Sequence, residues 1–240
     1  MGVEASLKAY SSTSSIIGSA FAPKPTLRRD LTELAVGYTL ILLVLWIPRP
    51  WQRFFFLGAL LWILVVTYLS FNGVKVMGLR LSSARRAFWI PALALLLAAI
   101  AIEVASRLHT LHSPGRPALF VKAFWGYAIW ACVQQFLLHN FFLLRLLRLL
   151  RTPTAATIVA SVLFALAHLP NPILTPITIL WGLAACMLFL RYRSLYPLAI
   201  AHAILGICFA ITVPAALDHD MRVGHGYFTY HQHDPLPQPE

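Results

Sequence analysis

Long apolar stretches, separated by short polar segments, fill most of the chain. A helix that crosses a bilayer needs about 20 mostly apolar residues. Seven stretches come close to or exceed that length: Leu31–Pro48, Phe54–Phe71, Ala87–Arg107, Leu119–Leu147, Thr154–Leu169, Ile173–Arg191 and Leu195–Ala215. The pattern predicts an all-α fold, a polytopic transmembrane helical bundle of about seven spans, in which the fifth span is short.

The two ends of the chain are more polar than this apolar region. We expect residues 1–30 to form a polar cytoplasmic segment, 31–217 the transmembrane helical domain, and 218–240 a polar tail. The tail contains His219, His225, His231 and His233. A polar segment of this kind buries little apolar surface, so we expect it to be solvated and partly disordered.

Composition and charge support a membrane location. Hydrophobic residues make up 59% of the chain, charged residues only 11%, and the mean hydropathy is +0.74, which excludes an ordinary soluble domain. The formal net charge is +11. With a cytoplasmic N-terminus, 13 of the 19 Lys and Arg residues fall on the inside. We therefore expect a multi-pass protein of the cell (inner) membrane, with membrane lipids rather than nucleic acid as partners.

Three arginines, Arg145, Arg148 and Arg151, are spaced three residues apart near the end of the fourth span. At the carboxyl end of a helix, cations interact favourably with the helix dipole. We expect all three to face the cytoplasmic headgroups.

Carboxylates are absent from a long part of the chain. Between Val104 and Leu217 there is no Asp or Glu, so a reaction placed there has no carboxylate of its own. Glu103 lies just outside this region, at the outer end of the third span. We expect it to be an ordinary solvated side chain.

Polar residues inside the predicted spans are the candidate functional groups, because a polar side chain in hydrocarbon is costly. Gln134, Gln135, His139 and Asn140 lie in the fourth span, His168 in the fifth and His202 in the seventh. Each alone is explained by an interhelical hydrogen bond, worth about 0.6 kcal/mol. Counted from the cytoplasmic helix ends, Gln134 and His168 both lie about 20 Å deep, and His139 and His202 about 10–12 Å. A shared cavity is therefore plausible.

These residues form three ordered motifs: QQFLLHN (134–140), FALAH (164–168) and HAILG (202–206). They resemble the motifs Glu-Glu-x-x-x-Arg, Phe-x-x-x-His and His-x-x-x-Asn of the CAAX-processing and bacteriocin-processing (CPBP) intramembrane endopeptidases, the type II CAAX prenyl proteases among them. The resemblance covers a CPBP-like core at about residues 119–215. The first three spans match only as generic membrane helices.

The resemblance implies proteolysis of a membrane-bound or prenylated (CAAX-type) peptide. By position, the water-activating pair becomes Gln134 and His168, the second acid becomes Gln135, the arginine becomes His139, and the oxyanion-stabilising pair becomes His202 and Gly206. Only His168 and His202 are retained. A neutral carboxamide cannot serve as a general base, so the two glutamines remove the carboxylate base that the family motif provides.

Three interpretations remain open. In the first, the protein is a working peptidase in which His168 or His139 is the base and His202 stabilises the oxyanion. In the second, the fold is kept by a non-catalytic pseudoprotease that binds or scaffolds a membrane partner. In the third, His139, His168 and His202 hold a metal such as zinc. We otherwise expect no cofactor.

Overall fold

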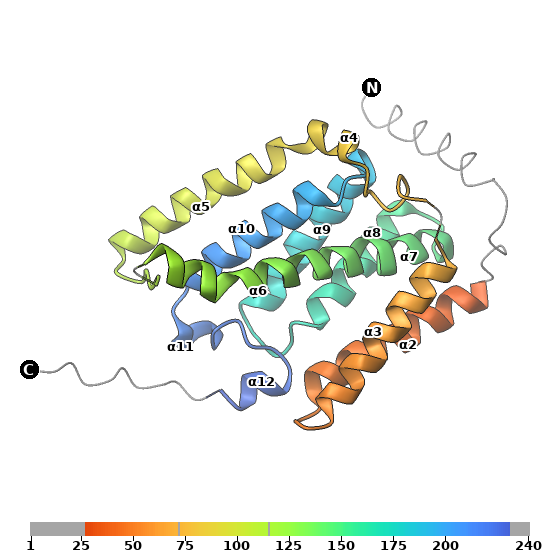
Figure 1. The fold of residues 1–240 in the computed structure, drawn as a ribbon, viewed down its shortest axis with the longest axis horizontal. Helices are drawn as coiled ribbons and strands as arrows, with labels where there is room; N and C mark the ends of the chain where they lie inside the picture. Colours follow the sequence, from red (N-terminus) through yellow and green to blue (C-terminus); the bar gives the residue numbers. More distant parts are fainter. Residues whose placement is uncertain (1–26, 72, 115, 231–240) are drawn as a thin grey trace, which may run out of the picture.

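The computed structural model describes residues 27–71, 73–114 and 116–230, and these are helical, with no strand among them (Figure 1). The longer helices are α2 (Leu27–Trp46), α3 (Gln52–Leu69), α5 (Trp89–Arg107), α6 (Pro117–Phe136), α8 (Pro153–Leu166), α9 (Leu174–Tyr192) and α10 (Tyr196–Thr212). The short ones are α4 (Leu81–Ala84), η1 (Arg85–Ala87), α7 (Leu144–Leu149), α11 (Ala215–Asp218) and α12 (His225–Phe228). A π-helix, η2 (Leu137–Leu143), connects α6 to α7.

The all-α membrane fold is confirmed, and a helix occupies each of the seven predicted stretches. Among the described residues, four segments are long and apolar enough to cross a membrane: α3, α5, the continuous run Pro117–Leu149, and α9. The apolar helices α8 and α10 are shorter, as expected for the fifth span. Large apolar side chains on α3 are exposed, Leu61 at 64% for example, which is favourable against lipid rather than water. The number of spans stays a prediction.

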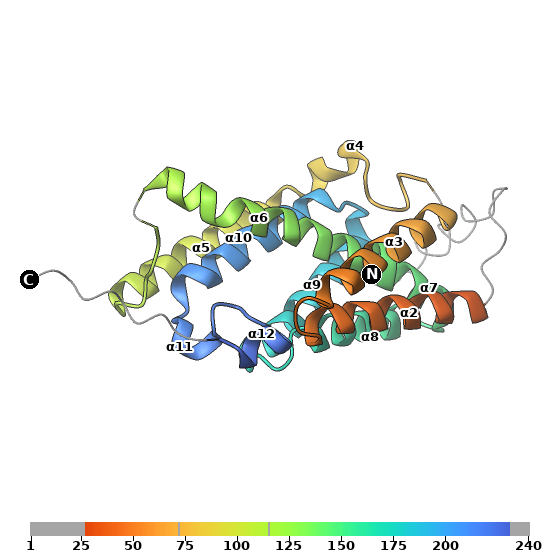
Figure 2. The same ribbon diagram turned by 60° about the horizontal axis from the view of Figure 1, so that its bottom comes forward.

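The helices pack in three groups. In Figures 1 and 2, α10 lies between α5 and α6, α8 runs beside α9, and α2 pairs with α3 at one side of the molecule. Tyr38 on α2 ties this pair to α8 by donating a 3.0 Å hydrogen bond to the carbonyl of Leu163. This arrangement places α6, α8, α9 and α10 around the polar residues of the three motifs.

Small residues let α8 and α9 approach closely. A Cβ at Gly182 would lie 3.1 Å from the Cα of Ser161, and Ala156, Ala160 and Ala185 are fully buried nearby in the core. Helix pairs in membranes pack mainly through such small residues, because lipid provides no hydrophobic drive for association. The first turn of α8 is capped by Thr152, whose hydroxyl accepts a 3.2 Å hydrogen bond from the Ala155 amide.

The beginning of the tail is packed against the bundle, so our expectation of a solvated segment is wrong for residues 218–230. Asp218 is 1% exposed and Asn171 is fully buried. The side chain of Asn171, in the turn after α8, donates to the carbonyl of Asp218 at 2.6 Å. The ring of His219 stacks on Tyr227 with 4.1 Å between centroids. His231 and His233 lie outside the described residues.

The polar N-terminal segment also ends earlier than predicted. Helix α2 begins at Leu27, and Asp30, assigned to the polar segment, is 1% exposed. The sequence pattern missed this because the first turn of α2 carries charges that pair with another part of the bundle.

Candidate active site

Gln135 and His202 form the centre of the candidate site. The amide Nε2 of Gln135 on α6 lies 2.7 Å from Nδ1 of His202 on α10, and both side chains are buried. The amide nitrogen can only donate, so Nδ1 of His202 accepts and its Nε2 carries the ring proton. Oε1 of Gln135 has no hydrogen-bond partner within the described part of the chain.

His168 reaches the same centre from the end of α8. Its Nδ1 donates a 2.8 Å hydrogen bond to the carbonyl of Phe164, which leaves Nε2 as an unprotonated acceptor. The Phe164 ring lies edge-on to both imidazoles, 4.9 Å from His168 and 6.1 Å from His202 by centroids. Trp181 of α9 also contacts His202, with 5.6 Å between the two ring centroids. The second and third motifs therefore converge on one phenyl ring.

His139 lies deeper and is held rigidly. It is fully buried, its Nδ1 donates to the carbonyl of Gln135 at 2.8 Å, and its ring stacks on Phe189 at 4.5 Å. It belongs to the π-helix η2, a wide turn that is frequent at functional sites. Its imidazole has no exposed edge, so it is poorly placed to meet a substrate.

Gln134 does not join this cluster as predicted. It is only half-buried, and no hydrogen bond connects it to His168 among the described residues. The two glutamines point in different directions because neighbours on a helix lie about 100° apart, and only Gln135 faces α10. Depth along the spans, which paired Gln134 with His168, carries no information on the direction of a side chain.

The three-histidine zinc site is not assembled. Within the described residues, no group of three or more His, Cys, Asp or Glu side chains could hold a metal ion. The physical reason is that the three rings do not meet at one point: His139 stacks on Phe189, whereas His168 and His202 both contact Phe164.

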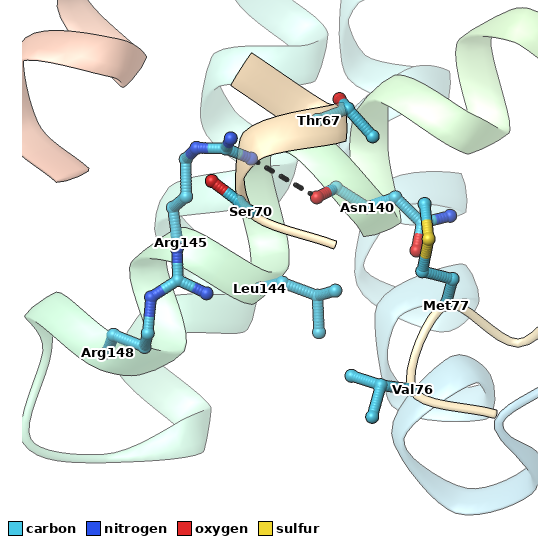
Figure 3. Close-up of a pocket in the computed structure, with 8 residues that line it drawn as sticks. All are labelled: Thr67, Ser70, Val76, Met77, Asn140, Leu144, Arg145 and Arg148. Carbon is cyan, nitrogen blue, oxygen red and sulfur yellow. Dashed lines mark hydrogen bonds between the residues drawn. The ribbon is translucent and has the colours of Figure 1, made fainter. Parts of the chain in front are cut away.

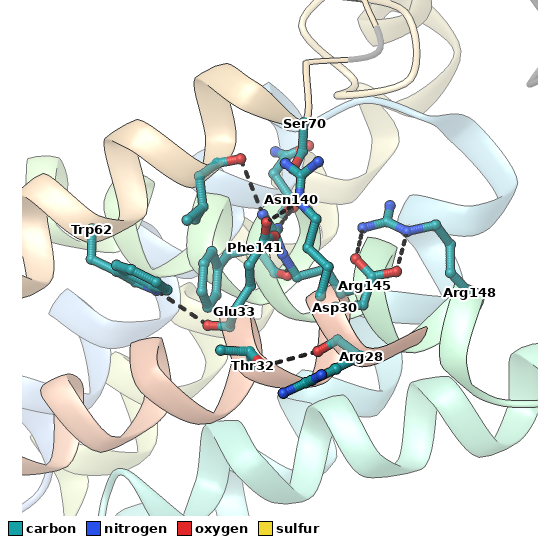
Figure 4. A network of polar contacts seen from close by, with 12 residues as sticks. Arg28, Asp30, Thr32, Glu33, Trp62, Ser70, Asn140, Phe141, Arg145 and Arg148 are labelled. Carbon is teal, nitrogen blue, oxygen red and sulfur yellow. Dashed lines mark hydrogen bonds and ion pairs between the residues drawn. The ribbon is translucent and has the colours of Figure 1, made fainter. Parts of the chain in front are cut away.

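A second polar cluster lies at the end of the bundle where α2 begins (Figure 4). Arg145 donates from Nε to Glu33 at 2.8 Å, and Arg148 binds Asp30 through two hydrogen bonds of 2.8 and 2.6 Å. The other Glu33 oxygen accepts from Arg29 at 2.7 Å. We call Arg29, Asp30, Glu33, Arg145 and Arg148 the ion-pair cluster.

Our assignment of Arg145 and Arg148 to lipid headgroups is therefore wrong. Arg145 is 2% exposed, and it also donates to the carbonyls of Phe141 and Val66 and lies 4.5 Å over the Phe141 ring. The sequence reasoning missed Asp30 and Glu33 as partners. The available signal was two acids one turn apart at the start of an apolar stretch, in a chain with very few acids.

A small cavity of about 20 Å³ adjoins the ion-pair cluster rather than the histidines (Figure 3). Asn140 and Thr67 line it with buried polar atoms that have no partner among the described residues. A space of this size suits a single water molecule. Arg145 and Arg148 also line it, but their guanidinium groups are engaged by carboxylates.

Glu103 is an exposed side chain, as expected. Its 2.7 Å ion pair is with Arg107 on the same helix, and the two side chains are 62% and 79% exposed. It supplies no carboxylate to the histidines.

Residues 84–208, just over half of the chain, match the family model described as type II CAAX prenyl endopeptidase Rce1-like. The chain belongs to this family. The match confirms the predicted family, and it begins earlier than expected, so that α5 belongs to the family region as well. Comparisons with curated proteins and with solved structures gave no match.

All three motifs lie within the Rce1-like region, whereas Asp30 and Glu33 on α2 lie outside it. The family match therefore supports a CAAX-type endopeptidase fold in an integral membrane protein. The roles of Gln134, Gln135, His139, His168 and His202 stay predictions.

Proposed function

We propose that this Rce1-like protein is an intramembrane endopeptidase that cleaves membrane-anchored, prenylated (CAAX-type) peptides. In this proposal a histidine, rather than a glutamate, activates the attacking water. The observation that carries the proposal is a pair of hydrogen bonds, from His168 to the Phe164 carbonyl and from Gln135 to His202, which favour opposite ring tautomers for the two imidazoles. His168 presents an unprotonated Nε2, and His202 presents a protonated one. A base and a hydrogen-bond donor at one site are the minimum for hydrolysis of an amide.

His168 is the general base in this proposal. Its bond to the Phe164 carbonyl holds the proton on Nδ1 and leaves Nε2 without a proton. A second partner of this kind orients an imidazole and makes its other nitrogen more basic. His139 is a weaker candidate because stacking on Phe189 buries it completely.

His202 is the oxyanion donor. The Gln135 amide, by donating to Nδ1, keeps the proton on Nε2, where it can meet a developing negative charge. A glutamate at position 135 would accept from Nδ1 instead and would move the ring proton away from Nε2. The carboxamide that removes a possible base at Gln135 therefore also prepares His202 as a donor.

The reaction then balances with water alone. Nε2 of His168 takes one proton from water while the water oxygen attacks the scissile carbonyl carbon, and the carbonyl oxygen becomes an oxyanion held by Nε2–H of His202. The protonated His168 returns that proton to the amide nitrogen as the C–N bond breaks. The products are a carboxylic acid, which loses its proton to solvent, and an amine.

The test is turnover of a farnesylated CAAX peptide by purified protein in lipid nanodiscs, with the same peptide lacking the prenyl group as substrate control. We expect His168→Ala to lower kcat by about 10²–10⁴-fold. His112→Ala is the matched control, since its exposed imidazole also binds a backbone carbonyl through Nδ1. Equal turnover by wild type and His168→Ala would refute the mechanism.

A pseudoprotease is the second candidate, favoured by the lack of any carboxylate contact to the histidines among the described residues. In that case wild type binds prenylated peptide without cleaving it. Activity that appears only in Gln134→Glu or Gln135→Glu, with none in wild type, would establish this alternative.

We also propose an inner-membrane location with the N-terminus in the cytoplasm, supported by the 13 of 19 basic residues assigned to that side. The ion-pair cluster then lies near the cytoplasmic face, and the packed residues 218–230 lie on the other. Labelling of single cysteines at Lys75 and Arg222 with a membrane-impermeant reagent in intact cells tests this, since only the second should react.

A further inference from the structure

Gly206 faces a side chain that fills the space above it. A Cβ built at Gly206 would overlap the hydroxyl oxygen and the ring of Tyr127. Tyr127 is on α6 and Gly206 on α10, two helices that pack side by side (Figure 1). The phenol of Tyr127 can approach the α10 backbone this closely only because residue 206 has no side chain.

The same two helix faces carry the candidate site. On α6, Tyr127, Ala131 and Gln135 recur every four residues and therefore share one face. On α10, His202 and Gly206 are likewise one turn apart. Gln135 contacts His202 and Tyr127 contacts Gly206, so the Tyr127 hydroxyl lies beside the α10 backbone one helical turn after His202.

The hydroxyl of Tyr127 does not contribute a hydrogen bond to the packing of the described helices. Tyr127 is half-buried between helices, and within the described residues its hydroxyl makes no hydrogen bond. A tyrosine hydroxyl held between helices usually has a partner. By contrast, Tyr38 donates to Leu163 and Tyr196 to Leu79. Tyr127 thus holds a free O–H donor against the α10 backbone at Gly206, one helical turn along α10 from the residue that carries the proposed Nε2–H donor, His202.

We propose that Tyr127 is the second oxyanion donor of this protein, its O–H acting together with Nε2–H of His202 on the tetrahedral intermediate. The proposal rests on the proposed function. It also explains Gly206, which stands where the resembling motif has Asn. The glycine leaves room for the Tyr127 hydroxyl of α6 at the place where the Asn side chain of the motif would project from α10. The phenol stays protonated throughout, so it adds no proton transfer to the reaction.

The test compares kcat and KM of Tyr127→Phe with wild type on the farnesylated peptide. We expect kcat to fall by about 100-fold with little change in KM, since an oxyanion donor acts only in the transition state. Tyr68→Phe, at a side chain 82% exposed, is the matched control and should behave as wild type. A packing role predicts no change, because phenylalanine keeps the ring.

Rescue gives a second readout. Tyr127→Ala empties the space over Gly206, and Tyr127→Ala/Gly206→Asn places an amide donor there from α10. We expect the double variant to recover at least about tenfold in kcat over Tyr127→Ala, whereas Gly206→Asn alone clashes with the phenol and loses activity. Full activity of Tyr127→Phe alongside an inactive His168→Ala would overturn this inference and leave the proposed function intact.

If wild type cleaves no peptide, the proposed function is refuted. The role of Tyr127 is then tested by measuring the affinity of the protein for a peptide analogue. The probe is a farnesylated peptide whose scissile amide is replaced by a phosphinate, an analogue of the tetrahedral intermediate. We expect Tyr127→Phe to bind it about 100-fold more weakly while binding the parent peptide equally. Equal binding of the phosphinate by both proteins would refute the role of Tyr127.

Discussion

Two polar clusters are buried in this bundle, and they differ in how completely their atoms are satisfied. In the ion-pair cluster, both oxygens of Glu33 and both of Asp30 accept hydrogen bonds from arginines. Around His202 every group is neutral, and Oε1 of Gln135 has no partner among the described residues. A saturated cluster of charges holds α2 against α7, whereas a neutral cluster with free donors and acceptors can bind a further molecule.

Removing one charge from the ion-pair cluster is expected to have the largest effect on stability. Arg145→Met leaves Glu33 buried with only Arg29 as partner and should lower the free energy of unfolding by about 3–5 kcal/mol, measured by denaturant titration in mixed micelles. Arg107→Met, in the exposed pair with Glu103, should cost less than about 1 kcal/mol.

The double variant Glu33→Leu/Arg145→Met sharpens this comparison. It removes both charges and should be more stable than Arg145→Met alone. Equal unfolding free energies for Arg145→Met and Arg107→Met would show that the buried cluster is not structural.

Adding a charge to the neutral cluster is the converse change. Gln135→Glu places a carboxylate at a fully buried position with no arginine beside it and should destabilise the protein by about 3 kcal/mol. Gln134→Glu, at the half-buried neighbour, should cost about 1 kcal/mol or less. The same denaturant titration distinguishes them, and a reversed order would mean that Gln134 faces the core.

Asp218 is intermediate between the two clusters, because it is a buried carboxylate without an arginine partner. We expect its contribution to stability to be the smallest of those discussed. Burial raises the pKa of Asp218, an effect that the amides of Met221 and Asp220 and the nearby His112 partly oppose. With the folded pKa above the unfolded one, the packing of residues 215–230 is strongest at low pH and weakens as pH rises through the folded pKa.

Hydrogen exchange of residues 215–230 measures this dependence. Protection should decline as the pH rises from acidic toward neutral values in wild type and should be flat in Asp218→Asn. A decline of the same size in the Asn variant would assign the effect to another group.

The sequence predicted the helical elements well and the side-chain partners poorly. All seven apolar stretches became helices, because their length and apolar content are local properties. The motifs also predicted His168 and His202 as site residues, and both imidazoles lie edge-on to the Phe164 ring. The different directions of Gln134 and Gln135 and the partner of Arg145 were not predicted, because both depend on which helix face meets which neighbour.

The sequence by itself determined the membrane helices, the order of the motifs and the absence of carboxylates from residues 104–217. These follow from composition and from spacing along one chain. Only the tertiary structure decided that α2 supplies its two acids to Arg145 and Arg148, that Gln135 sets the proton of His202, and that Tyr127 lies over Gly206. The reason is physical: these contacts join residues far apart in sequence, and helix packing alone brings them together.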